Sequence, residues 1–265
     1  MTFQPVVAGS GPVGWAFLQR TYDTQFEAFS KSHQFERDSE YFQSNIKNVT
    51  SASELVADRR LLDVALGAFG LQDDLNNRYF IQRILEDGTE ADDALANRLA
   101  DDRYKKLSQA FGFGPGEVAN TTDLQKMADI AAMNRVQSFE VAVGETDETM
   151  RIALYAQREL ASLASDSATE ETKWFRLMGL PPLREMFETA LGLPAAFASI
   201  PIDQQLENFR DRTRALTGND TVAQFSDPDA LSKLTKVYLA RSQIENFNSA
   251  TSPASSALQL LRSAG

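Results

Sequence analysis

The chain has 265 residues, a formal net charge of −11, one histidine and no cysteine. The length suits one large domain or two lobes, and the lack of cysteine excludes disulfides, thiolate nucleophiles and cysteine-ligated metals. A surface this acidic repels phosphate groups, so we expect no general nucleic-acid binding. No apolar run approaches the ~18 residues that a membrane-spanning helix needs, so we expect no membrane insertion.

The spacing of apolar residues predicts an all-α protein. They recur at intervals of three and four along most of the chain, and the sustained alternation typical of strands is missing. We expect a multi-helical bundle of about eight to eleven helices that forms one domain over residues 1–265. Two pseudo-repeated lobes, 15–112 and 121–248, are an alternative, because residues 112–116 (Gly-Phe-Gly-Pro-Gly) are the strongest helix breaker. We expect residues 1–14 to be a flexible arm and residues 251–265 a flexible tail.

The first predicted helices carry start and stop signals. Apolar stripes run from Trp15 to Phe29 and from Phe35 to Val49. Residues 51–54 (Ser-Ala-Ser-Glu) form a capping box, in which the serine oxygen and the glutamate satisfy free amides at the start of a helix. The buried face expected for the helix that it opens consists of Leu55, Leu62, Leu66 and Phe69.

The middle of the chain predicts three more helical segments. One covers residues 71–86 with Tyr79 facing inward, and the next covers residues 92–111 with a break near Asp101. A second capping box at residues 122–125 predicts a helix that ends at Gly144. Its expected apolar face consists of Ala128, Ala132, Val136, Phe139 and Val143.

The C-terminal part continues in the same pattern. Helices are predicted after Asp147, around Trp174 and from Pro181, since proline is tolerated in a first helical turn. Two longer ones are expected over residues 203–216 and 229–247. Residues 59–67 resemble residues 184–192, with matching Arg, Ala, Leu and Gly, which indicates either a duplicated helical unit or a common way to end a helix.

A glycine-rich segment near the N-terminus raises the question of nucleotide binding. Gly9, Gly11 and Gly14 match the GxGxxG pattern, whose glycines let backbone amides approach a pyrophosphate in dinucleotide-binding folds. That fold requires a strand before the motif and an acidic residue ending a second strand. The sequence offers neither, so a helix start near Trp15 after an N-terminal arm is the favoured interpretation.

Few residues are candidates for catalysis. The single histidine, His33, lies in a polar stretch typical of a helix junction, so a surface or capping role is favoured over general-base work. The Asp-Arg clusters at Asp58–Arg60 and Asp101–Arg103 either hold an anion or cap and tie helices, and the second reading is favoured. We therefore predict no catalytic, cofactor-binding or metal-binding residue.

Several motifs resemble an uncharacterised protein family. In chain order they are residues 58–62 (DRRLL), 65–71 (ALGAFGL), 99–104 (LADDRY), 111–113 (FGF), 139–144 (FEVAVG), 158–160 (REL), 178–184 (MGLPPLR), 190–194 (ALGLP) and 203–206 (DQQL). This series resembles the alphaproteobacterial domain-of-unknown-function 1217 family. The resemblance implies an all-helical protein, often encoded near flagellar genes, with no attached enzyme activity or cofactor. It marks Asp58, Arg60, Asp102 and Arg103 as family-typical positions with an expected structural role.

Three hypotheses for function follow. The leading one is a non-enzymatic structural or assembly-associated protein linked to the bacterial flagellum and motility, with flagellar proteins as partners. An alternative is a cytoplasmic helical adaptor or chaperone-like module that binds a partner's helix. A third is a nucleotide-binding enzyme that uses Gly9, Gly11 and Gly14. No signal peptide is visible, so we expect a cytoplasmic protein or one exported without a cleaved signal by the flagellar type III route.

Overall fold

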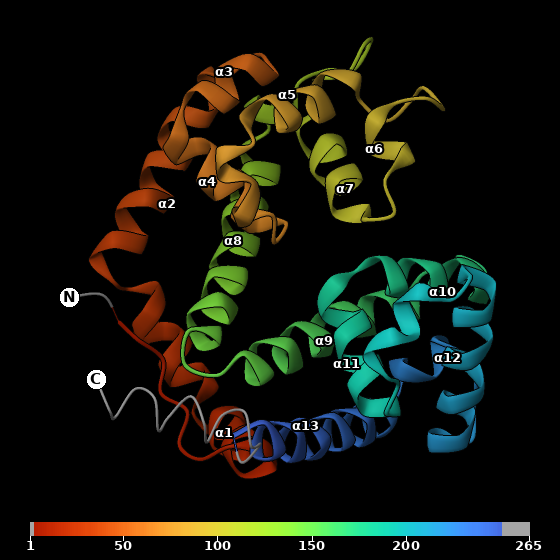
Figure 1. Cartoon of the computed structure of the whole chain (residues 1–265). Coiled ribbons are helices and arrows are strands. Elements are labelled where there is room, and N and C mark those ends of the chain that lie inside the picture. The colour runs from red at the N-terminus through yellow and green to blue at the C-terminus, as the bar shows by residue number, and fades with distance from the viewer. Residues whose placement is uncertain (1–2, 251–265) are drawn as a thin grey trace, which may run out of the picture. The chain divides into compact units, whose positions relative to one another are not determined.

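The computed structural model describes residues 3–250, which form thirteen α-helices and five short 3-10 turns, with no strand in this range. Figure 1 shows the helices in chain order. The all-α prediction is confirmed. The chain forms two compact units: unit 1 comprises Thr21–Thr146 with the residues up to Val6, and unit 2 comprises Val7–Arg20 with the residues from Asp147 onward.

Helix α1 (Gly11–Ser30) supplies its first half to unit 2 and its second half to unit 1. The other helices of unit 1 are α2 (His33–Asn45), α3 (Ala52–Ala57), α4 (Arg59–Ala68), α5 (Arg78–Asp87), α6 (Leu95–Arg98), α7 (Asp102–Phe111) and α8 (Leu124–Gly144). The remaining helices of unit 2 are α9 (Glu148–Ser165), α10 (Glu170–Gly179), α11 (Pro181–Leu191), α12 (Ile202–Thr217) and α13 (Pro228–Ala250).

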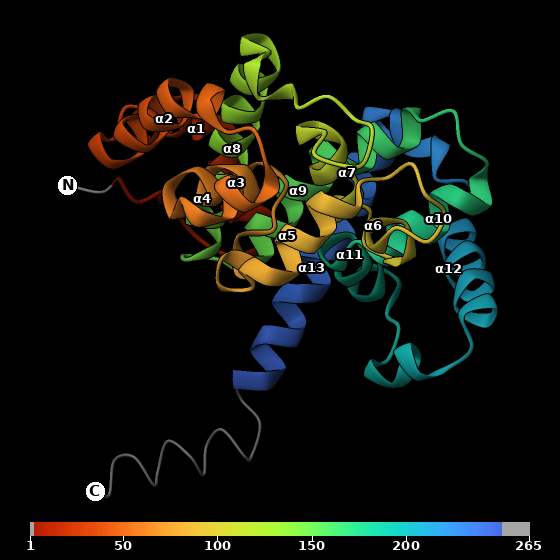
Figure 2. The ribbon, with the colours of Figure 1, turned by 90° about the horizontal axis from the view of Figure 1, so that it is seen from above.

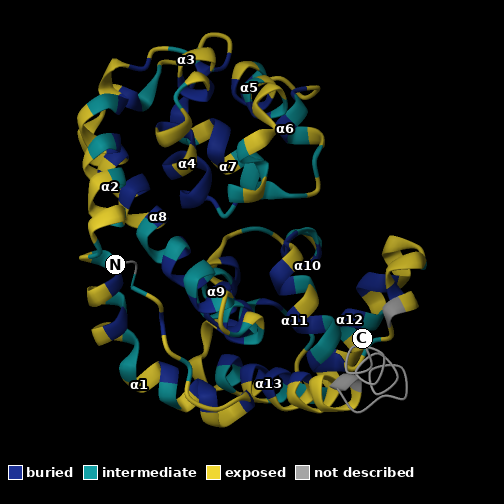
Figure 3. Cartoon of the chain, turned by 60° about the vertical axis from the view of Figure 1, so that its left-hand side comes forward, coloured by how far each residue is buried: buried dark blue, intermediate teal, exposed yellow. Residues whose placement is uncertain are grey.

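Helix α4 lies at the centre of unit 1. It packs along α8 and also contacts α2 and α3, and Figures 1 and 2 show α4 beside α8 from two directions. Nearly every residue of α4 after its first turn is buried, whereas α2 exposes most of its surface (Figure 3). The apolar residues that the sequence assigned to one buried face, Leu55, Leu62, Leu66 and Phe69, all lie in this core.

The predicted helix over residues 52–69 is in fact two helices. Ser51 caps α3 as expected, since its side chain accepts a hydrogen bond from the Glu54 amide at 3.3 Å. The chain then leaves helical geometry at Asp58, whose carboxylate caps a second helix, α4, by accepting from the amides of Arg60 and Leu61. An internal Asp therefore ends one helix and starts the next, because its short side chain satisfies free amides.

Two further predictions for unit 1 are wrong. Tyr79 is 82% exposed instead of inward-facing. A break at Asn77 sets the phase of α5, so that Ile81, Ile84 and Leu85 are buried and Tyr79 lies on the opposite face. The second capping box also fails, because Asp123 rather than Thr122 caps α8 through the amides of residues 125 and 126.

The segment expected to be a flexible arm is held by specific contacts. The Val6 amide donates to Gln25 Oε1 at 2.7 Å, and the hydroxyl of Thr146 donates to the carbonyl of Pro5 at 3.3 Å. Helix α1 begins at Gly11, four residues before the predicted start, and Gln243 donates to the hydroxyl of Ser10 at 3.1 Å. The tail predicted over residues 251–265 lies outside the described residues.

Unit 2 is organised around an aromatic cluster. Trp174 lies edge-to-face against Phe187 and stacks with Phe209, and Phe187 in turn contacts Phe225. These rings come from α10, α11, α12 and the 3-10 turn Ala223–Ser226. Interlocking rings from separate helices bury large apolar areas, so the cluster fixes how the helices of unit 2 pack together.

The boundary between the units differs from the one expected. One domain over residues 1–265 was the main expectation, and the alternative of two lobes placed their boundary near residues 112–121. That segment lies inside unit 1, and the chain passes from unit 1 to unit 2 between Thr146 and Asp147. Gly112 has a φ of +64°, and the turn that it starts returns the chain to α8 within the same unit. No helix among the described residues is both long enough and apolar enough to cross a membrane.

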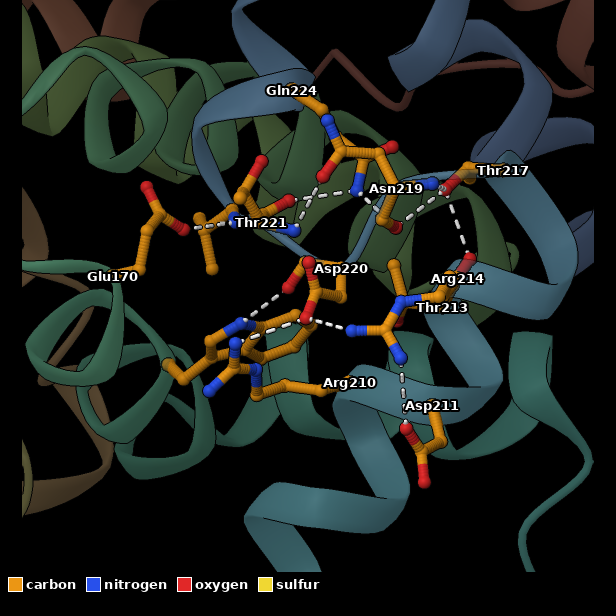
Figure 4. Close-up of polar contacts among 12 residues, drawn as sticks. Glu170, Arg210, Asp211, Thr213, Arg214, Thr217, Asn219, Asp220, Thr221 and Gln224 are labelled. Carbon is orange, nitrogen blue, oxygen red and sulfur yellow. Dashed lines mark hydrogen bonds and ion pairs between the residues drawn. The ribbon is translucent and has the colours of Figure 1, made fainter.

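A polar network holds the loop between α12 and the 3-10 turn in unit 2. The Asp220 carboxylate pairs with Arg210 at 2.9 Å and with Arg214 (Figure 4). The backbone carbonyl of Asp220 accepts a hydrogen bond from the indole N–H of Trp174 at 3.0 Å. Glu170 of α10 accepts a hydrogen bond from the amide of Val222 at 2.6 Å. The loop is thus tied to both α10 and α12.

We predict that Asp220→Asn lowers the free energy of unfolding of unit 2 by about 1–3 kcal/mol at neutral pH. Hydrogen bonds and charge from Arg210 and Arg214 lower the pKa of Asp220. A lowered pKa means that the ionised group stabilises the fold above the unfolded-state pKa of about 3.9. That contribution is lost as the pH falls through the folded-state pKa, so denaturant melts of parent and variant should converge in acid.

Asp211→Asn is the matched control. Among the described residues, the ion pair of Asp211 is with Arg214, at 3.4 Å, and the Asp211 side chain is 74% exposed. Its removal should therefore change stability by less than about 0.5 kcal/mol. Equal losses for the two variants would contradict the assignment of Asp220 as the clamp of this loop.

Candidate functional site

The structure uses the first Asp-Arg cluster to join α2 to α4. Asp58, besides capping α4, accepts a hydrogen bond from the hydroxyl of Tyr41 at 2.7 Å. Arg60 pairs with Asp38 at 3.0 Å and lies over the ring of Tyr41 at 3.9 Å. Partial burial opposes ionisation of Asp58, but the Tyr41 hydroxyl and the two capped amides lower its pKa. These contacts are those of a helix-to-helix tie.

The second cluster has a similar arrangement. Asp101 caps α7 through the amide of Arg103 and pairs with the Arg103 guanidinium at 2.7 Å. Arg103 also donates to the carbonyl of Gly70, just beyond α4, at 2.5 Å. The next residue, Tyr104, donates its hydroxyl to Asp74 at 2.6 Å, and burial followed by this carboxylate raises the pKa of Tyr104. The cluster therefore anchors α7 to the end of α4.

The glycines of the GxGxxG segment serve close packing in unit 2. Gly9 and Gly11 have φ values of +89° and +56°, which side-chain-bearing residues rarely adopt. A Cβ on Gly11 would overlap the side chain of Gln243, and one on Gly14 would overlap the carbonyl of Gly9 and approach Met150 at 3.0 Å. The described residues before the motif do not form a strand. His33, the other sequence candidate, is the exposed first residue of α2.

A polar pocket lies among α2, α4 and α8 of unit 1, and we call it the amide pocket. Its volume is about 190 Å³, and its polar lining includes Asp38, Asp63, Gln72, Asn134 and Gln137. Asn134 and Gln137 lie on the core-facing side of α8 and are only 7% and 8% exposed, although both are polar. The Gln72 Oε1 atom is buried without a hydrogen-bond partner. The pocket thus presents an acceptor that lacks a donor.

A second and larger pocket lies among α1, α2 and α8 of the same unit, and we call it the arginine pocket. Its volume is about 450 Å³, and Arg135 is its residue from α8. The Nε atom of Arg135 is buried and has no hydrogen-bond partner. Ser39 of α2 also lines this pocket and is only 8% exposed. Phe35 lines both pockets, so the two share a wall on α2.

Neither pocket was predicted from the sequence. Apolar spacing placed Ala128, Ala132 and Val136 on the buried face of α8, but the first two are exposed and Val136 is only partly buried. The true buried face includes Met127, Ile130, Ala131, Asn134 and Gln137. A signal was present in Gly67, against which Asn134 packs so closely that an added Cβ would overlap its Oδ1 atom. Without the pairing of α4 with α8, however, that glycine resembled an ordinary helix end.

Comparison with known proteins places the chain in a family. The family model described as "Protein of unknown function (DUF1217)" matches residues 68–231. The chain belongs to this family. The resemblance recognised from the sequence motifs is therefore confirmed. A DUF1217 assignment carries a fold and a set of motifs, without a named activity.

A solved structure extends the comparison beyond the DUF1217 match. The crystal structure of protein AGR_C_984 from Agrobacterium tumefaciens is similar to this chain with a TM-score of 0.71 and 25% sequence identity. The similarity covers 92% of this chain and 98% of that chain. No curated protein matches. Among residues 3–250, no three His, Asp or Glu side chains are grouped so that they could hold a metal ion.

We predict that Gly67→Ala destabilises unit 1 by about 1–3 kcal/mol, because the added methyl group overlaps the buried Asn134 amide. Denaturant unfolding measures the change. Adding Asn134→Ala removes the overlap, so the double variant should lose less than the sum of the two single losses. Strict additivity would contradict the inferred contact.

We also predict that Asp63→Asn stabilises unit 1 at neutral pH. Partial desolvation beside the pocket wall, and then the charge of Asp38, raise the pKa of Asp63 although the residue keeps much of its surface exposed, while Arg59 opposes the shift. A raised pKa means that the ionised carboxylate destabilises the fold. The gain should shrink as the pH falls through the folded-state pKa and vanish below the unfolded-state value. Thermal melts over a pH series measure it, with Asp92→Asn, an exposed loop site, as the control; a loss at neutral pH would refute the prediction.

Proposed function

We propose that this DUF1217 protein is a non-enzymatic structural or assembly-associated protein that acts by binding other proteins. The observation that carries this proposal is how the charged residues of the family motifs are used. Asp58, Arg60, Asp101 and Arg103 cap and connect helices within unit 1. Polar groups without partners instead line open pockets on α2 and α8. Such an arrangement suits recognition of a partner surface.

The proposed link to the bacterial flagellum and motility rests on the family resemblance, which implies frequent proximity to flagellar genes. A cytoplasmic adaptor or chaperone-like module is the alternative. The pockets on α2 and α8 support this alternative as well as they support a flagellar component. The two differ in where the protein acts. A flagellar component leaves the cytoplasm by the type III route and accompanies the hook and basal body, whereas an adaptor stays in the cytosol.

Deletion of the gene tests the proposal directly. We expect reduced swimming and incomplete filaments, measured in soft agar and by electron microscopy, with recovery when the gene is supplied on a plasmid. Antibody detection in purified hook–basal bodies and in cytosol then separates the exported component from the adaptor. Normal motility and normal filaments in the deletion strain would overturn the flagellar role.

A further inference from the structure

Arg135 is the starting point because its charge lacks a partner within the described structure. Its Nε atom is buried, with no hydrogen-bond partner. Lys31 pairs with Glu27 at 2.5 Å, so one carboxylate of the arginine pocket is already engaged. Glu36 and Glu40 also line the arginine pocket, but both are exposed and neither forms an ion pair with Arg135. A guanidinium held in this way is suited to an acceptor supplied from outside.

The surroundings of Arg135 specify a carboxylate. Ser39 places a hydroxyl group in the same pocket, and this hydroxyl forms no side-chain hydrogen bond among residues 3–250. One guanidinium and one hydroxyl match the two oxygens of a single carboxylate. Two further glutamates of this pocket, Glu36 and Glu40, are not neutralised by Lys31. They repel a doubly charged phosphate more strongly than a singly charged carboxylate and favour basic groups on either side of the bound acid.

The amide pocket, which shares Phe35 with the arginine pocket, favours a basic side chain instead of an acidic one. Arg60 balances the charge of Asp38, which leaves Asp63 as the unpaired carboxylate of that pocket. The Oε1 atom of Gln72 adds a buried acceptor without a donor. Because Phe35 lines both pockets, a donor for one pocket and an acceptor for the other fit on one short peptide segment. Such a donor is the cationic side chain of Lys or Arg.

We propose that α2 and α8 of unit 1 bind a segment of a partner protein that inserts an acidic side chain beside Arg135 and a neighbouring basic side chain beside Asp63. This inference rests on the proposed protein-binding function and names the chemistry of the partner. The complementarity lies in charge: a basic centre within an acidic rim accepts an acid flanked by bases.

The test uses the whole chain and a short synthetic peptide that carries one glutamate between two lysines, with the matching glutamine peptide as its control. Calorimetric titration should show binding of the glutamate peptide. We expect affinity to fall at least about tenfold for the glutamine peptide and for Arg135→Gln, which corresponds to the loss of about one charge-assisted contact. Arg37→Gln, an exposed arginine outside both pockets, should bind like the parent.

A second measurement separates a binding role from a structural one. Arg135→Met keeps the aliphatic stem but removes the buried donor, so its melting temperature should equal or exceed that of the parent while peptide binding is lost. A lower melting temperature of Arg135→Met than of the parent would overturn the proposal. So would a glutamate peptide that does not bind or that binds no better than the glutamine peptide. Inorganic phosphate that binds as tightly as the glutamate peptide would overturn it as well.

The failure of this inference is distinguishable from failure of the proposed function. A chromosomal Arg135→Gln strain should reproduce the motility defect of the deletion at normal protein levels. Normal swimming of that strain beside a non-motile deletion strain would overturn the role of Arg135 and leave the flagellar role standing. Normal swimming of both strains would overturn the flagellar role, and the peptide titration would then decide the binding site alone.

Discussion

The close contact between α4 and α8 is the constraint on which unit 1 depends. Gly67 has no side chain, so the buried amide of Asn134 can lie directly against the backbone of α4. This approach brings a polar face of α8 into the core, where apolar packing would otherwise be expected. The polar groups of this face border the amide pocket, so the packing of the two helices also shapes that pocket.

Several aspartates in this protein determine where helices begin. Asp58, Asp101 and Asp123 each begin a helix. Asp58 also accepts a hydrogen bond from Tyr41 of α2, and Asp101 pairs with Arg103 in the first turn of the helix that it caps. In unit 2 the same chemistry holds a loop, where two arginines of α12 converge on Asp220 (Figure 4). Arg135 departs from this pattern, since its charge serves no helix end and no loop.

The sequence was sufficient for the fold class, the family and most helix positions, because apolar spacing and glycine stops are local signals. Prediction from the sequence failed where tertiary contacts decide which residues are buried. The break at Asn77 turned Tyr79 outward, and the partner of α8 determined that Asn134 and Gln137, rather than Ala128 and Ala132, are buried. The pockets were unpredictable for the same reason: their lining residues come from helices whose pairing no local pattern specifies. The unit boundary was misplaced because the Gly112 turn redirects the chain within one core.

The division of α1 between the units bears on the order in which the chain can fold. Residues 7–20 belong with a unit that is otherwise built from residue 147 onward, and Ser10 meets Gln243 across 233 positions of sequence. During synthesis, the first half of α1 therefore waits for residues beyond 147 before its partners exist, beginning with α9, where Gln157 accepts a hydrogen bond from Gln19 at 3.0 Å. The two halves of one helix thus acquire their packing partners at different stages of synthesis.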